Sequence, residues 1–290
     1  MLTNVYHTGK PAISFELFPP KKWKGMAGLF QHFDELAQCK PAFVTCTYGA
    51  GGGDTIAKRT LELLGWIHGD YPNLPVMSHL TCVSMPPNDI RAYIAEAAQR
   101  GVRGIVALRG DAPRDDPDFV LPPDAFQHAS DLVAMIREEF PAMSIAVAGY
   151  PEKHPEAPDF TQDIAFLKEK VDRGAHVVIT QLFYDNAHYF RFRDQCVAAG
   201  ITVPIVPGIL PVTNLAQVKR IAGLCGAQMP SRLIERLEKH ADDEEGQFSV
   251  GVYFAGRQVE ELIEQGAPGI HFYVMNKSRA AALICRALTL

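Results

Sequence analysis

The sequence of 290 residues has no excess of positive charge, no closely spaced pair of cysteines and no long apolar run. Its net charge is −5, which gives no basic field to hold a phosphate backbone, so we expect no nucleic-acid partner. The six cysteines are scattered without a CxxC pair, a pattern typical of buried thiols in a reducing compartment.

Targeting and membrane signals are also missing. The N-terminal stretch MLTNVYHTGKP has no apolar core for a signal peptide, and no later run approaches the ~20 residues of a membrane span. We therefore expect a cytoplasmic protein with no membrane partner. No linker, internal repeat or low-complexity segment divides the chain.

The common motifs of metal and nucleophilic catalysis do not occur. The sequence has no HExxH, no HxH in its first apolar run and no other cluster with metal-ligand spacing, so we expect no metal. It has no GxSxG nucleophile elbow either. A polar site in such a chain suits an organic cofactor, to which the protein contributes placement and charge.

What the chain does contain is a repeated unit: a short apolar run, a polar or glycine stop, and an amphipathic stretch. The runs are Ala12–Leu17, Phe43–Tyr48, Val76–Cys82, Gly104–Leu108, Ser144–Tyr150, Val177–Phe183, Ile205–Leu210 and Ile270–Met275. Most follow the previous run by about thirty residues, as βαβ units require. The sequence therefore predicts an α/β fold, a (β/α)8 TIM barrel, with a doubly wound sheet as the alternative.

Helical patterns fill the intervals between the runs. They cover Thr55–Ile67 behind Asp54 as N-cap, Asp89–Arg100, Ala129–Phe140 with Ser130 near its start, Asp163–Arg173 and Ala187–Ala199. The seventh interval is longer, and Asn214–Leu224, Ser231–Lys239 and Gln247–Glu264 predict extra helices between strands 7 and 8. The acidic run Asp242–Glu245 is typical of a solvated turn.

The stretch GIVALRGD, from Gly104 to Asp111, is the clearest strand with a polar end. Its apolar part predicts a strand buried on both faces, and Arg109 and Asp111 follow at the carboxyl end, where parallel α/β proteins bind ligands. Gly110 between them lets the backbone approach a ligand. An ordinary salt bridge between Arg109 and Asp111 remains an open alternative.

The other runs also end in polar residues, and in a barrel these ends share one face. This predicted polar mouth contains Glu16, Thr47, Tyr48, His79, Thr81, Arg109, Asp111, Tyr150, His154, Gln181, Tyr273, Asn276 and Lys277. Glu16 lies among apolar neighbours, where a carboxyl is costly unless it is paired or protonated, so a functional role is favoured. His79 taken alone suits a satisfied core histidine, and Gln181 could bond a neighbouring strand. The glycine-rich GAGGGD, 49–54, indicates at most a phosphate-accepting turn.

The sequence resembles the bacterial methylenetetrahydrofolate reductases over almost its whole length. The matching blocks, in order, are SFELFPPK (Ser14–Lys21), FVTCTYGAGG (Phe43–Gly52), SHLTC (Ser78–Cys82), IVALRGD (Ile105–Asp111), AGYPEKHPEA (Ala148–Ala157), ITQLFYD (Ile179–Asp185), RFRDQC (Arg191–Cys196), PGILPV (Pro207–Val212) and HFYVMN (His271–Asn276). Their colinear order is far more specific than any single motif.

This resemblance implies one catalytic FAD-binding barrel domain over residues 1–290, without the C-terminal regulatory domain of eukaryotic members. The implied reaction is reduction of 5,10-methylenetetrahydrofolate to 5-methyltetrahydrofolate, a step of one-carbon metabolism and methionine biosynthesis. The expected partners are that folate, NADH or NADPH, and further copies of the chain in a homo-oligomer. The implied cofactor is FAD.

The resemblance also assigns roles to residues. Glu16 stands at the position of the general acid, and Asp111 at a position beside the flavin pyrimidine and the folate pterin. The implied cofactor-binding residues are Thr47, His79, Arg109, Gly110, Asp111, His128, Ala129, Ala148, Tyr150, His154, Asp163 and Lys170. The implied substrate-binding residues are Glu16, Gln181, Ile221, Tyr273 and Lys277.

At four positions the chain departs from the pattern of the bacterial members. His128 replaces a tyrosine, Phe166 an asparagine, Lys277 an arginine and Ile221 a larger apolar residue. A lysine cannot reproduce the bidentate carboxylate contact of an arginine. We expect these changes to act on cofactor affinity and on preferences for nucleotide and folate tail, and to leave the chemistry intact.

The implied mechanism is ping-pong. NAD(P)H gives a hydride to the flavin and leaves, and the folate then takes its place. Glu16 opens the folate ring to an iminium cation, which Asp111 stabilises while lowering the flavin potential. Two alternatives remain open: another flavin barrel oxidoreductase of the proline-dehydrogenase kind, and a folate-binding protein without catalysis.

Overall fold

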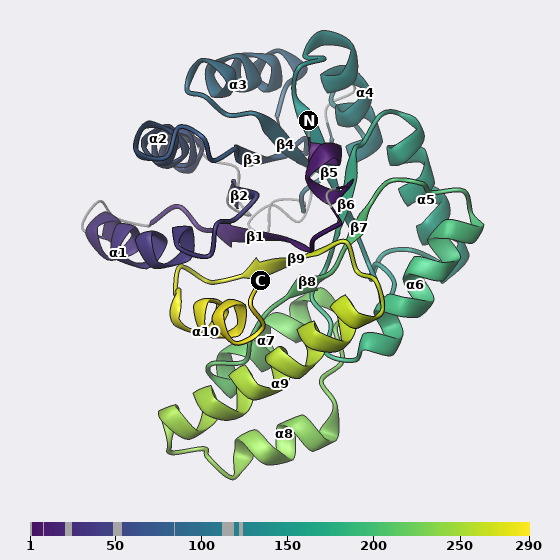
Figure 1. The fold of residues 1–290 in the computed structure, drawn as a ribbon. Coiled ribbons are helices and arrows are strands. Elements are labelled where there is room, and N and C mark those ends of the chain that lie inside the picture. Colours follow the sequence, from purple (N-terminus) through teal and green to yellow (C-terminus); the bar gives the residue numbers. More distant parts are fainter. Residues whose placement is uncertain are drawn as a thin grey trace.

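Parallel strands form a barrel that a layer of helices surrounds (Figure 1). The computed structural model describes residues 2–7, 9–20, 25–48, 54–83, 85–111, 119–121 and 124–290. The strands are β1 (Ala12–Leu17), β2 (Phe43–Cys46), β3 (Val76–Thr81), β4 (Gly104–Leu108), β5 (Ser144–Gly149), β6 (Val177–Thr180), β7 (Ile205–Val206), β8 (Gly208–Ile209) and β9 (Gly269–Tyr273). The α/β barrel predicted from the sequence is therefore confirmed.

The seventh strand of the barrel is split into β7 and β8 by Pro207. Proline has no backbone N–H to give to a ladder, so the regular pairing is interrupted there. β7 pairs with β6 and β8 pairs with β9, both in parallel. The carbonyl of Pro207 accepts a hydrogen bond from the His271 N–H at 3.0 Å, and this bond helps to close the ring.

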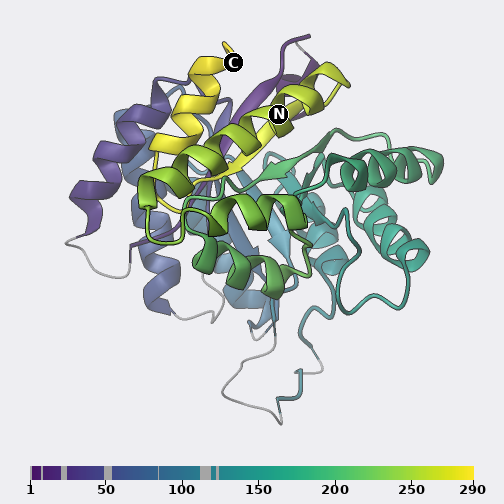
Figure 2. The same ribbon diagram turned by 90° about the horizontal axis from the view of Figure 1, so that it is seen from below.

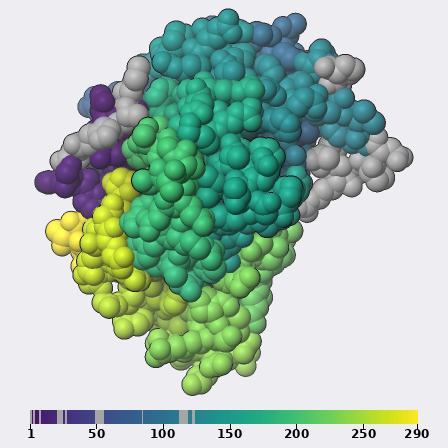
Figure 3. Space-filling view, turned by 90° about the vertical axis from the view of Figure 1, so that its right-hand side faces the viewer, coloured from purple at the N-terminus to yellow at the C-terminus, as the bar shows by residue number. Residues whose placement is uncertain are grey.

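Helices follow the strands in regular alternation. They are α1 (Met26–Ala37), α2 (Asp54–Asp70), α3 (Pro87–Gln99), α4 (Ala129–Glu139), α5 (Phe160–Asp172), α6 (Asn186–Ala198), α7 (Leu215–Cys225), α8 (Ser231–Glu238), α9 (Glu244–Glu264) and α10 (Arg279–Ala287). The extra helices expected between strands 7 and 8 are α7, α8 and α9. They lie together against one side of the barrel, and the yellow-green segment projects from it (Figures 2 and 3).

Residues of β1 alternate between the two faces of the barrel wall, because strand side chains have a period of two. Phe15 and Leu17 are fully buried in the cluster that packs the strands against the helices. Ala12 belongs to a second cluster, which the 3₁₀ helix η1 (Leu2–His7) joins through Leu2 and Tyr6. The same alternation leaves Glu16 on the opposite face of β1 from Phe15 and Leu17.

Several boundaries differ from the sequence prediction. β2, β5 and β6 end before the polar residues Thr47, Tyr150 and Gln181, and β3 ends at Thr81, one residue earlier than predicted. The turn predicted over 49–54 lies, up to residue 53, outside the described residues. α4 begins behind His128, whose backbone N–H donates to the Asp131 carboxylate at 3.0 Å, whereas Ser130 lies buried inside the helix. The solvated turn predicted at Asp242–Glu245 is confirmed at Asp242, and all four residues are exposed, but Asp243 caps α9 by accepting from the Gly246 N–H and the helix begins at Glu244.

In the part of the chain that the structure describes, no helix has both the length and the apolar character needed to cross a bilayer.

Candidate active site

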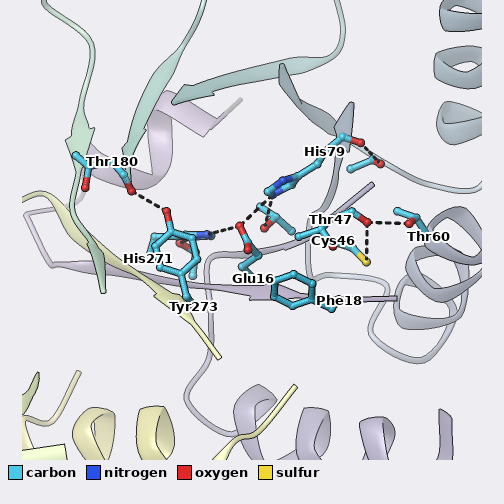
Figure 4. A network of polar contacts seen from close by, with 12 residues as sticks. Glu16, Phe18, Cys46, Thr47, Thr60, His79, Thr180, His271 and Tyr273 are labelled. Carbon is cyan, nitrogen blue, oxygen red and sulfur yellow. Dashed lines mark hydrogen bonds and ion pairs between the residues drawn. The ribbon is translucent and has the colours of Figure 1, made fainter. Parts of the chain in front are cut away.

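Glu16 lies at the centre of the barrel mouth with only 8% of its surface exposed (Figure 4). Its Oε2 atom is 3.4 Å from His79 Nε2 and 3.9 Å from His271 Nε2. Its sequence neighbours Phe15 and Leu17 suggested apolar surroundings, but both point to the other face of β1. The carboxyl is thus buried between two imidazoles, an arrangement that sequence spacing alone did not indicate.

His79, on β3, is buried and holds a fixed orientation. Its Nε2 atom lies 3.2 Å from Thr45 Oγ1 on the neighbouring strand β2. Burial lowers the pKa of His79, and the nearby charge of Glu16 opposes that effect. A neutral imidazole therefore faces the Glu16 carboxyl near neutral pH. His79 is thus a buried histidine with a polar partner, as expected from the sequence, and it also lies beside Glu16 at the site.

His271 was not among the residues selected from the sequence. It is 1% exposed, and its Nδ1 atom lies 2.8 Å from Ser14 Oγ. Ser14 precedes Glu16 by two residues, and His271 precedes Tyr273 by two. The signal that could have found Ser14 and His271 is this period of two along β1 and β9, which directs polar residues into the barrel.

Tyr273, on β9, donates its hydroxyl hydrogen to the carbonyl of Thr180 at 2.7 Å, across the split strand. This bond fixes the phenol ring at the wall of a cavity of about 310 Å³. The cavity, called here the Glu16 cavity, is lined by Glu16, Phe18, His79, Val106, Leu108, Ala148, Tyr150, Ile179, Gln181, Leu182, Leu210, Ile221, Cys225, His271, Tyr273 and Met275. Four of the five expected substrate-binding residues therefore share one cavity; Lys277 is absent from its lining.

Gln181 lies directly after β6, and its side chain bonds locally. Its side-chain oxygen accepts from the Leu182 N–H at 2.8 Å. The hydrogen bond to a neighbouring strand considered from the sequence is formed by its backbone, whose N–H donates to the Gly149 carbonyl on β5 at 2.7 Å. The side-chain amide N–H₂ group remains available on the cavity wall, because only the side-chain oxygen is used in the bond to Leu182.

A second cavity, of about 260 Å³, contains most of the expected cofactor-binding residues. This Lys170 cavity is lined by Ala107, Leu108, Arg109, His128, Ala129, Ser130, Ala148, Tyr150, His154, Glu156, Ala157, Asp163, Phe166, Glu169 and Lys170. It shares Leu108, Ala148 and Tyr150 with the Glu16 cavity. A ligand in one cavity is therefore adjacent to a ligand in the other.

Lys170 is a partly buried cation of this second cavity. Its ammonium group donates to the Ala148 carbonyl at 2.7 Å. Burial lowers its pKa to about 8, and the charge of Asp163 partly offsets that effect. Asp163 accepts from the His154 N–H at 2.9 Å, while burial raises the pKa of its carboxyl.

Arg109 and Asp111 do not form the salt bridge considered from the sequence. Arg109 pairs with Glu156 instead, with 2.6 Å between Nη2 and Oε2. Gly110 has a φ of 85°, a left-handed conformation that glycine adopts without strain, and the turn it makes directs Arg109 to the cavity. Asp111 is exposed and is not part of the lining of either cavity.

Thr47 supplies an independent indication of a missing ligand. Its backbone carbonyl accepts from Thr60 Oγ1 at 2.8 Å, whereas its own hydroxyl is buried with no hydrogen-bond partner among the described residues. A buried hydroxyl without a partner is costly, so it marks a place where a polar ligand group would fit. The Thr47 hydroxyl and the Lys170 cavity, whose charged lining includes Arg109, Lys170 and three carboxylates, both offer hydrogen-bonding groups to a polar cofactor.

Two of the departures from the family pattern face this cavity. Phe166, on α5, lines it and is 49% exposed. His128 lines it from the N-cap of α4. A phenyl ring in place of an amide removes one hydrogen-bonding group from the cavity wall and leaves an apolar surface.

Lys277 lines a third cavity, of about 380 Å³, called here the outer cavity. Of the substrate-binding residues implied by the resemblance, Ile221 and Tyr273 line both this cavity and the Glu16 cavity.

In the described part of the chain, no group of three or more His, Cys, Asp or Glu side chains is arranged to hold a metal ion.

Comparison with known proteins agrees with this geometry. The family model described as methylenetetrahydrofolate reductase matches residues 1–289. The 5,10-methylenetetrahydrofolate reductase of Escherichia coli is 39% identical over 280 residues, which cover 97% of this chain and 91% of that protein. Methylenetetrahydrofolate reductase (NADH) 1 of Arabidopsis thaliana is 36% identical over 97% of this chain and 48% of its own length.

A solved structure has the same fold at low sequence identity. It is an uncharacterized protein from Clostridium thermocellum that binds two copies of 5-methyl-5,6,7,8-tetrahydrofolic acid, with a TM-score of 0.67 and 15% identity over 99% of this chain and 98% of that chain. At that identity the likeness shows the barrel alone. The family match over residues 1–289 goes further, and the chain belongs to the methylenetetrahydrofolate reductase family.

Proposed function

We propose that this chain reduces 5,10-methylenetetrahydrofolate to 5-methyltetrahydrofolate with NADH or NADPH, by way of a bound FAD. The observation that carries this proposal is the position of Glu16. It is a buried carboxyl in a cavity that shares lining residues with the Lys170 cavity and with the outer cavity, which Lys277 lines. The carboxyl that we assign as proton donor thus adjoins the cavity assigned to the cofactor and the cavity assigned to the rest of the substrate.

The residues that would hold FAD are those of the Lys170 cavity together with Thr47, His79, Gly110 and Asp111. Lys170 and Arg109 offer positive charge to phosphate groups, and Tyr150 and Ala148 form the boundary with the Glu16 cavity. When bound there, FAD supplies the hydride-carrying chemistry that links the nucleotide and the folate.

Glu16 is assigned as the general acid. Opening the five-membered ring of the folate needs a proton, and Glu16 is the carboxyl in the lining of that cavity. The imidazoles of His79 and His271, whose Nε2 atoms lie 3.4 and 3.9 Å from its Oε2 atom, would be the partners through which its proton is replaced. Because the nucleotide and the folate would use the same cavity in turn, we propose a ping-pong order.

Asp111 is assigned to stabilise the iminium cation that forms when the ring opens. The side chain is exposed at the end of β4, and its charge acts on the Tyr150 hydroxyl and the Cys225 thiol, which both line the Glu16 cavity. A negative charge at that mouth also disfavours additional negative charge on a neighbouring flavin.

We further propose that residues 1–290 act as one catalytic barrel in the cytoplasm. All six cysteines are free thiols, as proteins of a reducing compartment usually have.

The proposed function predicts a yellow protein that releases FAD, not FMN, on heat denaturation. Anaerobic NADH or NADPH should bleach the bound flavin, and 5,10-methylenetetrahydrofolate should then restore its colour and yield 5-methyltetrahydrofolate. Bleaching by proline but not by NAD(P)H would identify the chain as a flavin barrel oxidoreductase of the proline-dehydrogenase kind. A protein that binds folate but takes up no FAD even on reconstitution would be a binding protein without catalysis.

A second prediction concerns Lys170. Lys170→Met should raise the Kd for FAD by about 10- to 100-fold, because a charge-assisted hydrogen bond to a phosphate is worth about 1.5–3 kcal/mol. In the wild-type protein, FAD affinity should also fall as pH rises above about 8, where Lys170 loses its charge. Titration of the apoprotein with FAD from pH 6.5 to 9.5 measures both effects.

The stability of the apoprotein provides the control for this substitution. The pKa of Lys170 is about 8 in the folded chain and about 10.4 unfolded, so the unfolded chain binds more protons between those values. The free energy of unfolding therefore rises with pH across this window, and Lys170→Met should flatten that rise without lowering stability at pH 7. An apoprotein that unfolds on this substitution would show that Lys170 is structural.

A further inference from the structure

The third cavity continues the Glu16 cavity away from the barrel axis. It lies between the start of α7, the start of α9 and the turn from β9 to α10, and shares Leu210, Ile221, Tyr273 and Met275 with the Glu16 cavity. Because they share these residues, the two cavities form one groove that begins at Glu16. The helices α7, α9 and α10, which contribute to its lining, lie near β9 (Figure 1). A ligand longer than one cavity can therefore extend from one into the other.

The outward edge of this groove changes from apolar to cationic along a single segment. Tyr273 and Met275 line both cavities, whereas Lys277 and Arg279 line only the outer one. A ligand matches the edge formed by residues 273–279 when it is aromatic or apolar near Glu16 and anionic at its outer end, where Glu244 and Glu245 also line the cavity and Glu245 pairs with Arg279. A pteridine joined through a benzoyl group to glutamates has that order of groups.

Asn276 holds the segment in place. Its side-chain amide donates to the Phe18 carbonyl at 2.8 Å and accepts from the Phe18 N–H at 2.8 Å, which ties the turn to the end of β1. Met275 and Asn276 both have left-handed φ values, 48° and 58°. Such values are unfavourable for residues other than glycine, so the turn depends on this double hydrogen bond.

Arg279 already holds a carboxylate at the outer end. Its two terminal nitrogens bond the two oxygens of Glu245 at 2.5 and 2.7 Å, and its guanidinium lies over the Phe248 ring, 4.0 Å from the centroid. This is the bidentate geometry in which arginine recognises carboxylates. Both side chains are more than half exposed, so the pair is screened by water and easily exchanged.

We propose that Arg279 is a binding site for a carboxylate of the oligo-γ-glutamyl tail of the folate substrate, and that Glu245 occupies the site until the tail displaces it. Glu245 is then an internal competitor that reduces the preference for longer tails. This inference rests on the proposed reductase function. Lys277, which forms no ion pair among the described residues, receives a carboxylate closer to the benzoyl group.

The test compares monoglutamyl and triglutamyl 5,10-methylenetetrahydrofolate in the oxidative half-reaction of Glu245→Gln and Arg279→Gln. Glu245→Gln removes the competitor. It should raise the ratio of kcat/KM for the triglutamate to kcat/KM for the monoglutamate by about two- to fivefold. Arg279→Gln should lower that ratio to about one. Both changes should appear in KM and not in kcat, because the tail is remote from the reacting atoms. Added salt should weaken the wild-type preference.

Glu238→Gln is the matched control. Glu238 on α8 also forms an exposed ion pair, with Lys219 at 2.9 Å, but it does not line the groove. Glu238→Gln should leave the triglutamate-to-monoglutamate ratio of kcat/KM at the wild-type value. Equal ratios in all four proteins would overturn the inference while leaving the reductase function in place.

The reductive half-reaction separates this proposal from a cationic site for the phosphates of the nicotinamide nucleotide. If the variants change the KM for NADH or NADPH and not the tail-length ratio, the outer cavity serves the nucleotide and our inference is wrong. A wild-type protein that turns over neither folate would mean that the proposed function has failed. Direct binding of triglutamyl 5-methyltetrahydrofolate, measured by calorimetry, would still test the site in that case.

Discussion

Glu16→Gln should slow reoxidation of the reduced flavin by 5,10-methylenetetrahydrofolate by about 10² to 10⁴, the usual value of general acid catalysis. Reduction of the flavin by NAD(P)H should remain within about tenfold of wild type, equivalent to about 1.4 kcal/mol of barrier. Hydride transfer from the nicotinamide needs no proton from the protein, whereas opening the folate ring does. The two half-reactions therefore separate a proton donor from a structural residue.

The surroundings of Glu16 make glutamine a suitable replacement. The carboxyl is buried, and its Oε2 atom lies 3.4 Å from His79 Nε2. A glutamine keeps the size and the hydrogen-bonding capacity but has no acidic proton. FAD content and thermal stability should therefore change little, which would show that lost activity reflects lost chemistry.

Anaerobic stopped-flow absorbance of the bound flavin measures each half-reaction separately. Glu139→Gln is the control, since Glu139 is a surface carboxylate that pairs with Arg91 at 2.7 Å and lines none of the three cavities. It should match the wild type in both steps. Equal losses in both half-reactions of Glu16→Gln would make Glu16 structural, and full activity in both would remove it from the mechanism.

Much of the barrel could be predicted because local pattern and global fold agree. Gly104–Leu108 and Ala12–Leu17 are strands with the predicted bounds, since runs of buried apolar residues stop at polar ones. The seventh strand, predicted as one run over Ile205–Leu210, is divided at Pro207 because proline cannot donate to a ladder. The strand predicted over Val177–Phe183 ends at Thr180; Gln181 and Leu182 line the Glu16 cavity, and Phe183 is buried in the core.

The contacts within the site could not be predicted to the same extent. His271 is 257 residues from Ser14 in the chain, yet their side chains meet at 2.8 Å. Only the closed barrel places β9 beside β1 and makes this contact possible. The sequence placed Glu16 and His79 in one polar mouth but did not select His271, because the pairing of β9 with β1 is a long-range contact.

The outer cavity shows the same limit. Glu245 belonged to an acidic run that suggested a solvated turn, and Arg279 lay beyond the last recognised block. Only the packing of α9 against the start of α10 brings their charges together at 2.5 Å. Whether a surface charge is solvated or serves a site is therefore decided by tertiary packing, which sequence charge patterns do not specify.

Gly251→Ala should lower the stability of the protein by about 2–4 kcal/mol, whereas Gly256→Ala on the same helix should raise it by about 0.5–1 kcal/mol. A Cβ atom at Gly251 would lie 1.7 Å from the carbonyl oxygen of Val212, and backbone there cannot rotate away. A Cβ atom at Gly256 meets nothing within 4 Å, so only the higher helix propensity of alanine remains.

Gly251 matters to the site because α9 must pack closely on the segment that follows β8. One turn earlier in α9, Gln247 accepts from the Leu215 N–H at 2.8 Å and so caps the start of α7. Both helices line the outer cavity. An outward shift of α9 at Gly251 would therefore weaken this cap and move Glu245 relative to Arg279.

Thermal unfolding of the two holoproteins at one scan rate measures the contrast. With about 2–4 °C per kcal/mol for a domain of this size class, Gly251→Ala should lower Tm by about 4–16 °C and Gly256→Ala should raise it by about 1–4 °C. The two glycines share one helix and receive the same methyl group, so any difference comes from the neighbouring Val212 backbone. Similar Tm changes in both variants would contradict the close packing of α9, and with it the groove that extends outward from Glu16.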